Sequence, residues 1–298
     1  MKILITGASG MIGSELRKLL RLKGHELLLA SRRDPDKPDQ IKWTVEDGFA
    51  EPKKLEGLDA VIHLAGESIS GGLRWSEEKK RAIRDSRVLG TRNVVDTLRN
   101  LESKPRVFIS GSAIGFYGDR GDEVLTESSG PGDTFLADVS KEWEAESLRA
   151  NELGIRTVLL RTGIVLTKEG GALGTMLTPF KMGVGGVVGS GKQWMSWISI
   201  DDEIGIIDFA LENETVEGPI NVVAPNPVTN DEFTKSLGAV IHRPTILPLP
   251  EFAVNLIFGE MGDALLLAST RVIPEKSQQL GYKFKYPQLD EALKAALV

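Results

Sequence analysis

A buried strand followed by three evenly spaced glycines opens this chain, and no other stretch of the sequence restricts the fold as strongly. The apolar run at residues 3–5 predicts a strand covered on both faces. Gly7, Gly10 and Gly13 follow it, and the next residues predict a helix with an apolar stripe made of Met11, Ile12, Leu16, Leu19 and Leu20. Such a turn presents backbone N–H groups at the helix N-terminus, where they bind an anion. The context predicts a pyrophosphate-binding turn; the alternative is that these are only turn and packing glycines.

Composition excludes several classes of protein. The net charge of −6 over 298 residues gives no positive field for nucleic acid or acidic membranes, so we expect neither as a partner. The chain has no cysteine, which excludes disulfides and thiol nucleophiles, and its three widely separated histidines argue against structural zinc. The first predicted strand begins at Lys2, which leaves no room for a signal peptide. No apolar run approaches the roughly 20 residues of a membrane span. We expect a cytoplasmic protein.

Strand and helix patterns alternate through the first half of the chain. Further strands are predicted at residues 26–30, 60–65, 106–110 and 157–161, and helices at 76–101 and 135–152. This alternation predicts a Rossmann-type α/β fold, a doubly wound parallel sheet with right-handed crossovers. We expect a nucleotide-binding domain at residues 1–165 with a return segment near 195–223. A smaller C-terminal substrate lobe would then comprise residues 166–194 and 224–298.

The rhythm changes beyond Arg161. Residues 170–191 contain eight glycines, too permissive a composition for a core element. They predict either a loop that folds over a ligand or a plain surface connection. Trp194 and Trp197, just beyond, would either form the floor of a substrate pocket or close the core between the lobes.

The end of the second strand indicates which cofactor is bound. In a dinucleotide fold this position meets the adenosine ribose and usually carries an acidic residue that binds the 2′-hydroxyl. Here it holds Ser31, Arg32 and Arg33. Guanidinium groups bind a 2′-phosphate well, so we infer NADP(H). The alternative is that both arginines are solvated surface charges.

The glycine spacing, with Thr6 before it, resembles the phosphate loop of the extended, epimerase-like branch of the short-chain dehydrogenase/reductase superfamily. Four further segments resemble the atypical epimerase-family members, which have a C-terminal domain of unassigned function and lack the tyrosine of the active-site helix. These segments are residues 74–76, 86–91, 189–198 and 271–274. The resemblance spans essentially the whole chain.

The resemblance also implies further cofactor contacts. Met11 and Ile12, within the glycine turn, would join it in holding the cofactor. The segment Leu64, Ala65 and Gly66 lies where related enzymes pass backbone along the adenine and the pyrophosphate. Arg87 on the long predicted helix would face the same groove, or would be a solvated charge on the helix surface.

By the same resemblance, Ser112 is the serine that hydrogen-bonds the reacting oxygen, and Lys141 binds the nicotinamide ribose. The family motif is Tyr-x-x-x-Lys, but this chain has Ala137 four residues before Lys141. Alanine transfers no proton, so either another group replaces the tyrosine or no redox chemistry occurs.

Candidates for the missing proton carrier remain open. Tyr117 matches a second tyrosine of the family, for which packing or substrate contact is favoured over proton transfer. Glu67, Asp138 and Lys141 are further candidates, each with a solvated or structural role as its alternative.

Two functions follow as hypotheses. The first is an NADP(H)-dependent oxidoreductase or epimerase that acts on a small carbonyl or sugar-like substrate. The second is a regulatory protein that binds NADP(H) without turnover. A strongly charged surface on the helix at 76–101 favours a monomer or a weak dimer.

Overall fold

A central sheet of eight strands dominates the computed structural model, which describes residues 1–297. Its order is β12-β8-β6-β5-β1-β2-β3-β4. The strands are β1 (Lys2–Thr6), β2 (Glu26–Ser31), β3 (Gln40–Thr44), β4 (Gly48–Phe49), β5 (Ala60–His63), β6 (Val107–Ala113), β8 (Arg156–Thr162) and β12 (Gly218–Val222). All neighbours pair in parallel except β3 and β4. The predicted Rossmann-type fold is confirmed.

Strand β1 lies at the point where the strand order reverses. It pairs with β2 on one side and β5 on the other, so the loops that follow β1 and β5 leave in opposite directions. In open α/β sheets such a switch point forms a crevice at the carboxyl ends of the strands, where ligands bind. The glycine turn follows β1 directly, at the edge of this crevice.

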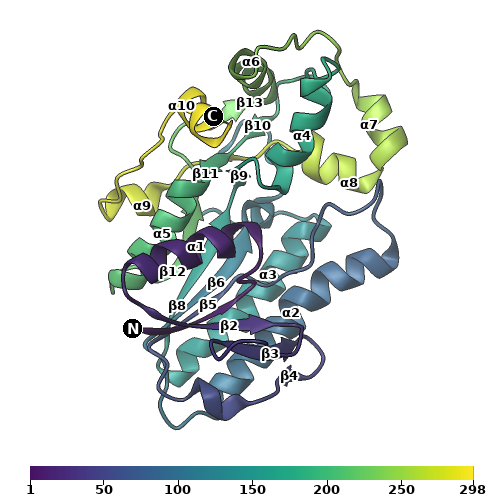
Figure 1. Ribbon diagram of the computed structural model, residues 1–298. Helices are drawn as coiled ribbons and strands as arrows, with labels where there is room; N and C mark the ends of the chain where they lie inside the picture. The colour runs from purple at the N-terminus through teal and green to yellow at the C-terminus, as the bar shows by residue number, and fades with distance from the viewer. Residues whose placement is uncertain (298) are drawn as a thin grey trace.

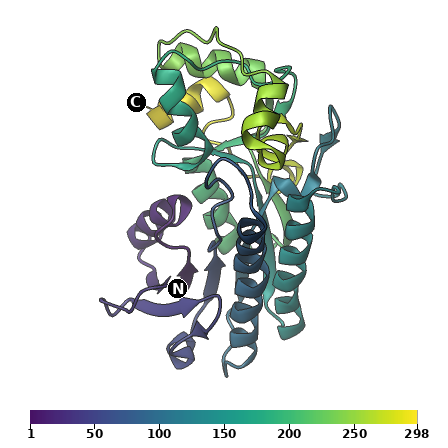
Figure 2. The ribbon, with the colours of Figure 1, turned by 90° about the vertical axis from the view of Figure 1, so that its right-hand side faces the viewer.

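Helices cover both faces of the sheet (Figure 2). Helices α1 (Met11–Leu22) and α5 (Ile200–Glu212) pack together on one face, and α2 (Glu77–Arg99) and α3 (Phe135–Leu148) on the other. Ile3 and Ile5 enter the first core while Leu4 enters the second, as the alternation of a strand requires. Burial on both faces explains why β1 is apolar throughout.

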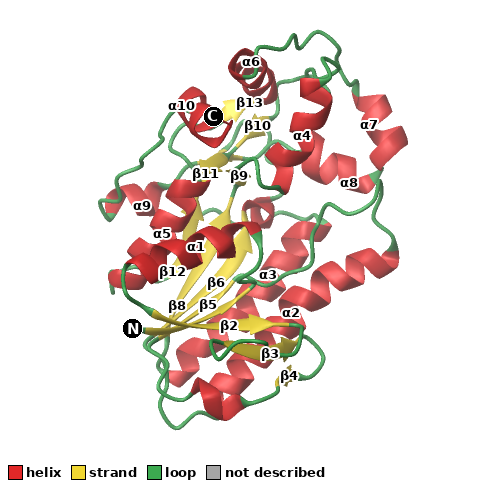
Figure 3. Ribbon diagram, in the orientation of Figure 1, coloured by secondary structure: helices red, strands yellow, loops and turns green. Residues whose placement is uncertain are grey.

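A smaller lobe lies above the carboxyl ends of the strands, with the C-terminus in it, whereas the N-terminus lies at the side of the larger lobe (Figures 1 and 3). Its strands are β9 (Ile164–Leu166), β10 (Trp194–Met195), β11 (Trp197–Ser199) and β13 (Val228–Thr229). Its helices are α4 (Gly171–Lys181), α6 (Asn230–Val240), α7 (Glu251–Phe258), α8 (Glu260–Gly262) and α10 (Leu289–Leu297). The short elements β7 (Val124–Leu125), β14 (Arg271–Val272) and α9 (Glu275–Gln279) lie where the lobes meet.

The structure differs from the sequence expectation in two segments. Residues 170–191 do not form one long loop, because helix α4 occupies their first half. Leu173, Leu177 and Phe180 recur at helical spacing and are buried in the core of the smaller lobe, which offsets the cost of the glycines. Strands β3 and β4 extend the sheet where no strand was expected; the buried side chains of Ile41 and Trp43 alternate with half-buried ones there.

Within residues 1–297, no helix has both the length and the apolar character needed to cross a membrane.

Candidate cofactor and active site

The glycine turn is a cradle that side chains would fill. Gly7 has a φ of +67°, a conformation that favours glycine, and a Cβ on it would lie 2.7 Å from the backbone of Leu64. A Cβ on Gly13 would lie 2.3 Å from the carbonyl oxygen of Gly7. Gly10 is the N-cap of α1, whose first turn holds no acidic residue. The turn therefore presents an uncrowded helix N-terminus that fits a pyrophosphate.

A buried hydrogen-bond chain fixes the second side of the crevice. The Thr6 hydroxyl lies 2.7 Å from Nδ1 of His63 and accepts a hydrogen bond from the Ala65 amide at 3.2 Å. The other ring nitrogen of His63 lies 3.1 Å from the Thr91 hydroxyl. Burial lowers the pKa of His63 to about 4, so the imidazole is neutral at pH 7. His63 therefore acts as a structural link that holds the segment 64–66 beside the glycine turn.

The arginine pair at the end of β2 is exposed. Ser31 accepts a hydrogen bond from the Arg33 amide, which turns the chain after the strand. Within residues 1–297, no ion pair engages Arg32 or Arg33. Both guanidinium groups are therefore available to an anionic ligand at the end of β2.

Arg87 extends from α2 toward the crevice. Its Nη1 donates to the carbonyl oxygens of Glu67 and Ile83 at 3.0 and 3.1 Å. Its guanidinium packs over the Trp143 ring, and a Cβ on Gly66 would lie 3.4 Å from its Cζ. Burial lowers the pKa of Arg87 to about 10, a value at which it remains charged at pH 7. The arginine is held in place by backbone carbonyls and lies against the segment 64–66.

A cavity of about 410 Å³ lies between the two lobes, above the ends of β6 and β8. The large lobe contributes Arg87, residues 113–115 and one face of α3. The smaller lobe contributes residues of α4, of the segment 184–188, of α6 and of the segment 247–270. The cavity adjoins the crevice through Arg87, so a cofactor in the crevice and a substrate in the cavity would be neighbours.

The face of α3 that lines this cavity does not carry the pair expected from the motif. Four side chains of α3 reach the cavity: Leu136, Val139, Ser140 and Trp143. Leu136 and Ser140 have the four-residue spacing of the motif. Ala137 is fully buried in the protein core. The structure does not bring Lys141 to the cavity; its ammonium pairs with Asp138 at 2.6 Å on the outer side of the helix. Ser140, and not Lys141, therefore lies on the cavity face of α3.

Ser112 belongs to a buried hydrogen-bond network. Its hydroxyl donates to Oε1 of Glu144 at 2.6 Å, and Glu144 binds Arg161 on β8. Ala113, the next residue of β6, reaches the cavity, whereas Ser112 does not line it. In this arrangement the Ser112 hydroxyl donates its proton in a hydrogen bond to the Glu144 carboxylate and not toward the cavity.

Tyr117 is fully buried on the far side of the same network. Its hydroxyl donates to Oδ1 of Asn221 at 2.6 Å and lies 3.0 Å from the donating Nη1 of Arg161. Burial raises the pKa of its phenol above the ordinary value. Tyr117 is therefore buried in this network and does not line the cavity. Glu67, another candidate proton carrier, pairs with Lys79 at 2.6 Å.

The sequence reading missed Glu203, on the first turn of α5. Its Oε1 accepts a hydrogen bond from the Thr162 hydroxyl at 3.1 Å, and Thr162 lines the cavity. Its Oε2 is buried without a hydrogen-bond partner among the described residues. Burial raises the pKa of Glu203 to about 8, so the side chain is mostly protonated at pH 7. The sequence did contain a signal for this residue, because Glu203 occupies the same face of the helix as the apolar residues Ile206 and Ile207.

The two tryptophans beyond the glycine-rich segment have different environments. Trp194 lines the cavity, stacks with Arg271 and donates from its indole to Asp122. Trp197 is fully buried in the core of the smaller lobe. Gly185 and Gly186 line the cavity too, so this half of the glycine-rich segment forms part of its wall.

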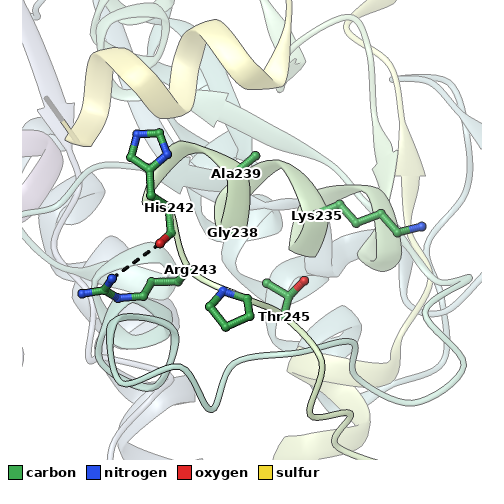
Figure 4. A pocket seen from close by; sticks show the side chains of 7 residues that line it. Lys235, Gly238, Ala239, His242, Arg243 and Thr245 are labelled. Atoms are coloured by element: carbon green, nitrogen blue, oxygen red, sulfur yellow. Dashed lines mark hydrogen bonds between the residues drawn. The ribbon is translucent and has the colours of Figure 1, made fainter.

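A second hollow lies on the surface at the end of α6, between Lys235 and Thr245 (Figure 4). The side chains of Lys235 and His242 point in different directions there, and Lys235 pairs with Asp231 at 2.6 Å. No convergent set of polar groups marks it as a ligand site. Across residues 1–297, no group of three or more acidic or histidine side chains is placed to hold a metal ion.

Comparison with known proteins agrees with this geometry. Residues 3–224 match the model of the NAD dependent epimerase/dehydratase family, and residues 249–296 match a domain of unknown function, DUF1731. An epimerase family protein of Mycobacterium leprae, ML0860, is 40% identical over 294 residues, which cover 99% of this chain and 95% of that protein.

Two solved structures are similar over the whole chain. The human epimerase family protein SDR39U1, crystallised with NADPH, superposes with a TM-score of 0.89 at 35% identity and 99% coverage of both chains. A nucleoside-diphosphate sugar epimerase from Corynebacterium glutamicum gives a TM-score of 0.83 at 36% identity, with all of this chain covering 58% of that one.

Proposed function

Because the chain belongs to the NAD dependent epimerase/dehydratase family and ends in a domain of unknown function, we propose that it is an NADP(H)-dependent oxidoreductase or epimerase acting on a carbonyl group. The observation that carries the proposal is the cradle formed by Gly7, Gly10 and Gly13 beside a cavity with a fixed guanidinium. The predicted cytoplasmic location and the monomeric or weakly dimeric state stay predictions.

The residues present fit a phosphorylated dinucleotide. The glycine turn, with Met11 and Ile12 at the start of α1, would bind the pyrophosphate, and the segment 64–66 would lie along it. Ser31, Arg32 and Arg33 would bind the 2′-phosphate. NADPH in the crystal structure of the human relative supports the phosphorylated form. When bound, the nicotinamide supplies or accepts a hydride.

This chain's own residues would then position the substrate. Arg87 holds N–H groups at the border of crevice and cavity, where they can polarise a carbonyl oxygen. Thr162 lines the cavity with a protonated Glu203 behind it. This pair would replace the missing tyrosine as a proton source only after the Thr162 hydroxyl turns from Glu203 to the substrate and accepts the proton of the Glu203 carboxyl. Ser112 would take part only after its hydroxyl leaves Glu144.

Binding without turnover is the second candidate function. It is favoured by one observation: the cavity face of α3 presents Leu136 and Ser140, and neither side chain matches the tyrosine and lysine of the family motif. A protein that binds NADP(H) with different affinity in two conformations needs no proton donor there.

Cofactor titration tests the shared part of both functions. We expect Arg32→Ala to weaken NADPH binding about tenfold or more and NADH binding little, because a charge-assisted hydrogen bond contributes about 1.5 to 3 kcal/mol. Arg81→Ala, an exposed arginine on α2, is the matched control and should leave both affinities unchanged. Equal losses for the two cofactors would contradict the 2′-phosphate assignment, and no measurable heat with NADPH would contradict the proposal.

A turnover assay separates the two functions. Purified protein with NADPH is incubated with aldehydes, ketones and nucleotide sugars, and NADPH absorbance and product epimers are followed. Turnover that Arg87→Ala abolishes supports the enzyme. Tight NADPH binding without turnover across the panel supports the binding protein. Ser112→Ala, assayed in parallel, shows whether the buried hydroxyl contributes.

A further inference from the structure

The wall of the cavity is predominantly apolar. The large lobe supplies Leu136, Val139 and Trp143 from one face of α3. The smaller lobe faces them with apolar side chains from several separate segments, among them Met176, Phe180, Leu249 and Phe258. A wall of this kind stabilises a ligand mainly by removing apolar surface from water.

Several polar side chains of the wall are hydrogen-bonded to neighbouring groups of the protein. The Gln193 amide donates to the carbonyl oxygens of Val188 and Leu266. The carbonyl of the Asn230 side chain accepts from the Val188 amide, and Ser196 donates to the Thr270 carbonyl. These hydrogen bonds stabilise the shape of the cavity, and they use the donors of Gln193 and Ser196.

Charge in the wall is low. Among residues 1–297, Arg87 is the only charged side chain in the lining, and two backbone carbonyls already occupy its Nη1. A diphosphate carries two negative charges, and removing them from water without several charge-assisted donors is costly. A single guanidinium neutralises only one of the two charges. The cavity therefore lacks the groups that a nucleoside diphosphate needs.

The cavity also has an apolar opening. Val184 and Leu247 belong to the lining, and each is 50% exposed, so the apolar wall continues to the surface. A volume of about 410 Å³ falls within the range of small-molecule sites. An extended apolar molecule can thus enter with its polar end toward Arg87 and leave its tail between Val184 and Leu247.

We propose that this cavity binds an uncharged, apolar carbonyl compound, such as a long-chain ketone or aldehyde, and that it does not bind nucleotide sugars. This assignment rests on the proposed function, of which it names the substrate class. It differs from the sugar nucleotide specificity that the name of the Corynebacterium relative indicates.

The test measures occupancy of the cavity without turnover. The neutral fluorescent probe N-phenyl-1-naphthylamine is titrated into the full-length protein with and without NADPH, and 2-decanone and UDP-glucose are added as competitors. We expect probe fluorescence to rise on binding, 2-decanone to displace the probe, and UDP-glucose to leave it in place.

Variants then locate the probe. Leu136→Trp fills the cavity from α3 and should weaken probe binding about tenfold, whereas Leu148→Trp, an exposed position on the same helix, should not. Thr175→Trp, at an exposed position of the lining on α4, serves as a second cavity variant if the first one fails to fold.

Displacement of the probe by UDP-glucose, or probe binding that neither cavity variant weakens, would overturn the proposal. Failure of the proposed function has a different signature, because it appears as a lack of NADPH binding in the cofactor titration while the probe still binds without NADPH.

Discussion

Glu144 binds Arg161 through two parallel hydrogen bonds inside the molecule, Nε to Oε1 and Nη2 to Oε2, both at 2.8 Å. The side chains are only 8% and 5% exposed, and they join α3 to the end of β8. Ser112 donates to the same carboxylate. This ion pair therefore sets the direction of the Ser112 proton and holds α3 in the orientation in which Leu136 and Ser140 face the cavity.

Glu144→Gln should destabilise the protein by about 3 to 5 kcal/mol, because the change leaves a buried guanidinium without its counter-charge. Urea unfolding measures the loss. The matched control is Glu152→Gln, which breaks an exposed pair with Arg99 and should cost less than about 1 kcal/mol. Similar small losses for both variants would show that the buried pair does not hold α3 in place.

Gly13→Ala should weaken NADPH binding more than about tenfold, since the new Cβ would lie 2.3 Å from the Gly7 carbonyl oxygen and would displace the turn. Gly174→Ala on α4 meets its nearest atom at 3.6 Å and should keep the wild-type affinity. Calorimetric titration measures both. Normal NADPH affinity in a folded Gly13→Ala variant would argue against the glycine cradle.

Glu203 should make the protein less stable as the pH rises. Its pKa of about 8 in the folded state exceeds the value in the unfolded chain, so the folded state keeps a proton that the unfolded state releases. The free energy of unfolding contributed by this group therefore falls between about pH 4.5 and 8, by up to about 1.4 kcal/mol per pH unit.

Urea unfolding at a series of pH values checks this, with Glu203→Gln expected to remove the decline and exposed Glu212→Gln to retain it. The comparison is made above pH 6.5. Below that, the lowered pKa of His63 acts in the opposite direction, because its unfolded state binds more protons and stability is lost as the pH falls toward 4. A parallel decline in Glu203→Gln would rule out Glu203 as its source.

Lys141→Ala should change NADPH affinity by less than about twofold, because its ammonium pairs with Asp138 on the outside of α3. NADPH titration measures the effect. A large loss in Lys141→Ala would restore the motif-based role of that lysine.

Arg87→Ala should lower kcat/KM for a carbonyl substrate more than about tenfold, and Arg87→Lys should recover only part of it, since lysine lacks the planar donor fork. Steady-state kinetics measure both variants.

The cofactor side of the molecule was predictable because its signals are local. The spacing of Gly7, Gly10 and Gly13 between a strand and a helix implies a turn whatever the rest of the chain does, and the parallel sheet follows from the alternation of elements. Helix α4 was missed because glycine content outweighed the apolar spacing of Leu173 and Leu177 in the interpretation.

The residues that line the cavity were harder to predict because their positions depend on tertiary packing. A motif fixes the spacing of two residues on α3 but not which face of the helix meets the cavity, and Ser140 rather than Lys141 lies on that face. The spacing of Leu136, Val139 and Trp143 on one face was an available signal. The contact between Glu203 and Thr162 required the fold, since β8 and α5 meet only in three dimensions.

The position of β12 at the edge of the sheet determines when the protein can fold during synthesis. This strand follows the excursion into the smaller lobe and pairs with β8, while Ile206 and Ile207 of α5 enter the core that contains Ile3 and Ile5. A nascent chain that ends at residue 165 therefore has a bare strand edge and an uncovered apolar face. The dinucleotide-binding half cannot be completed on the ribosome until residue 222 has emerged.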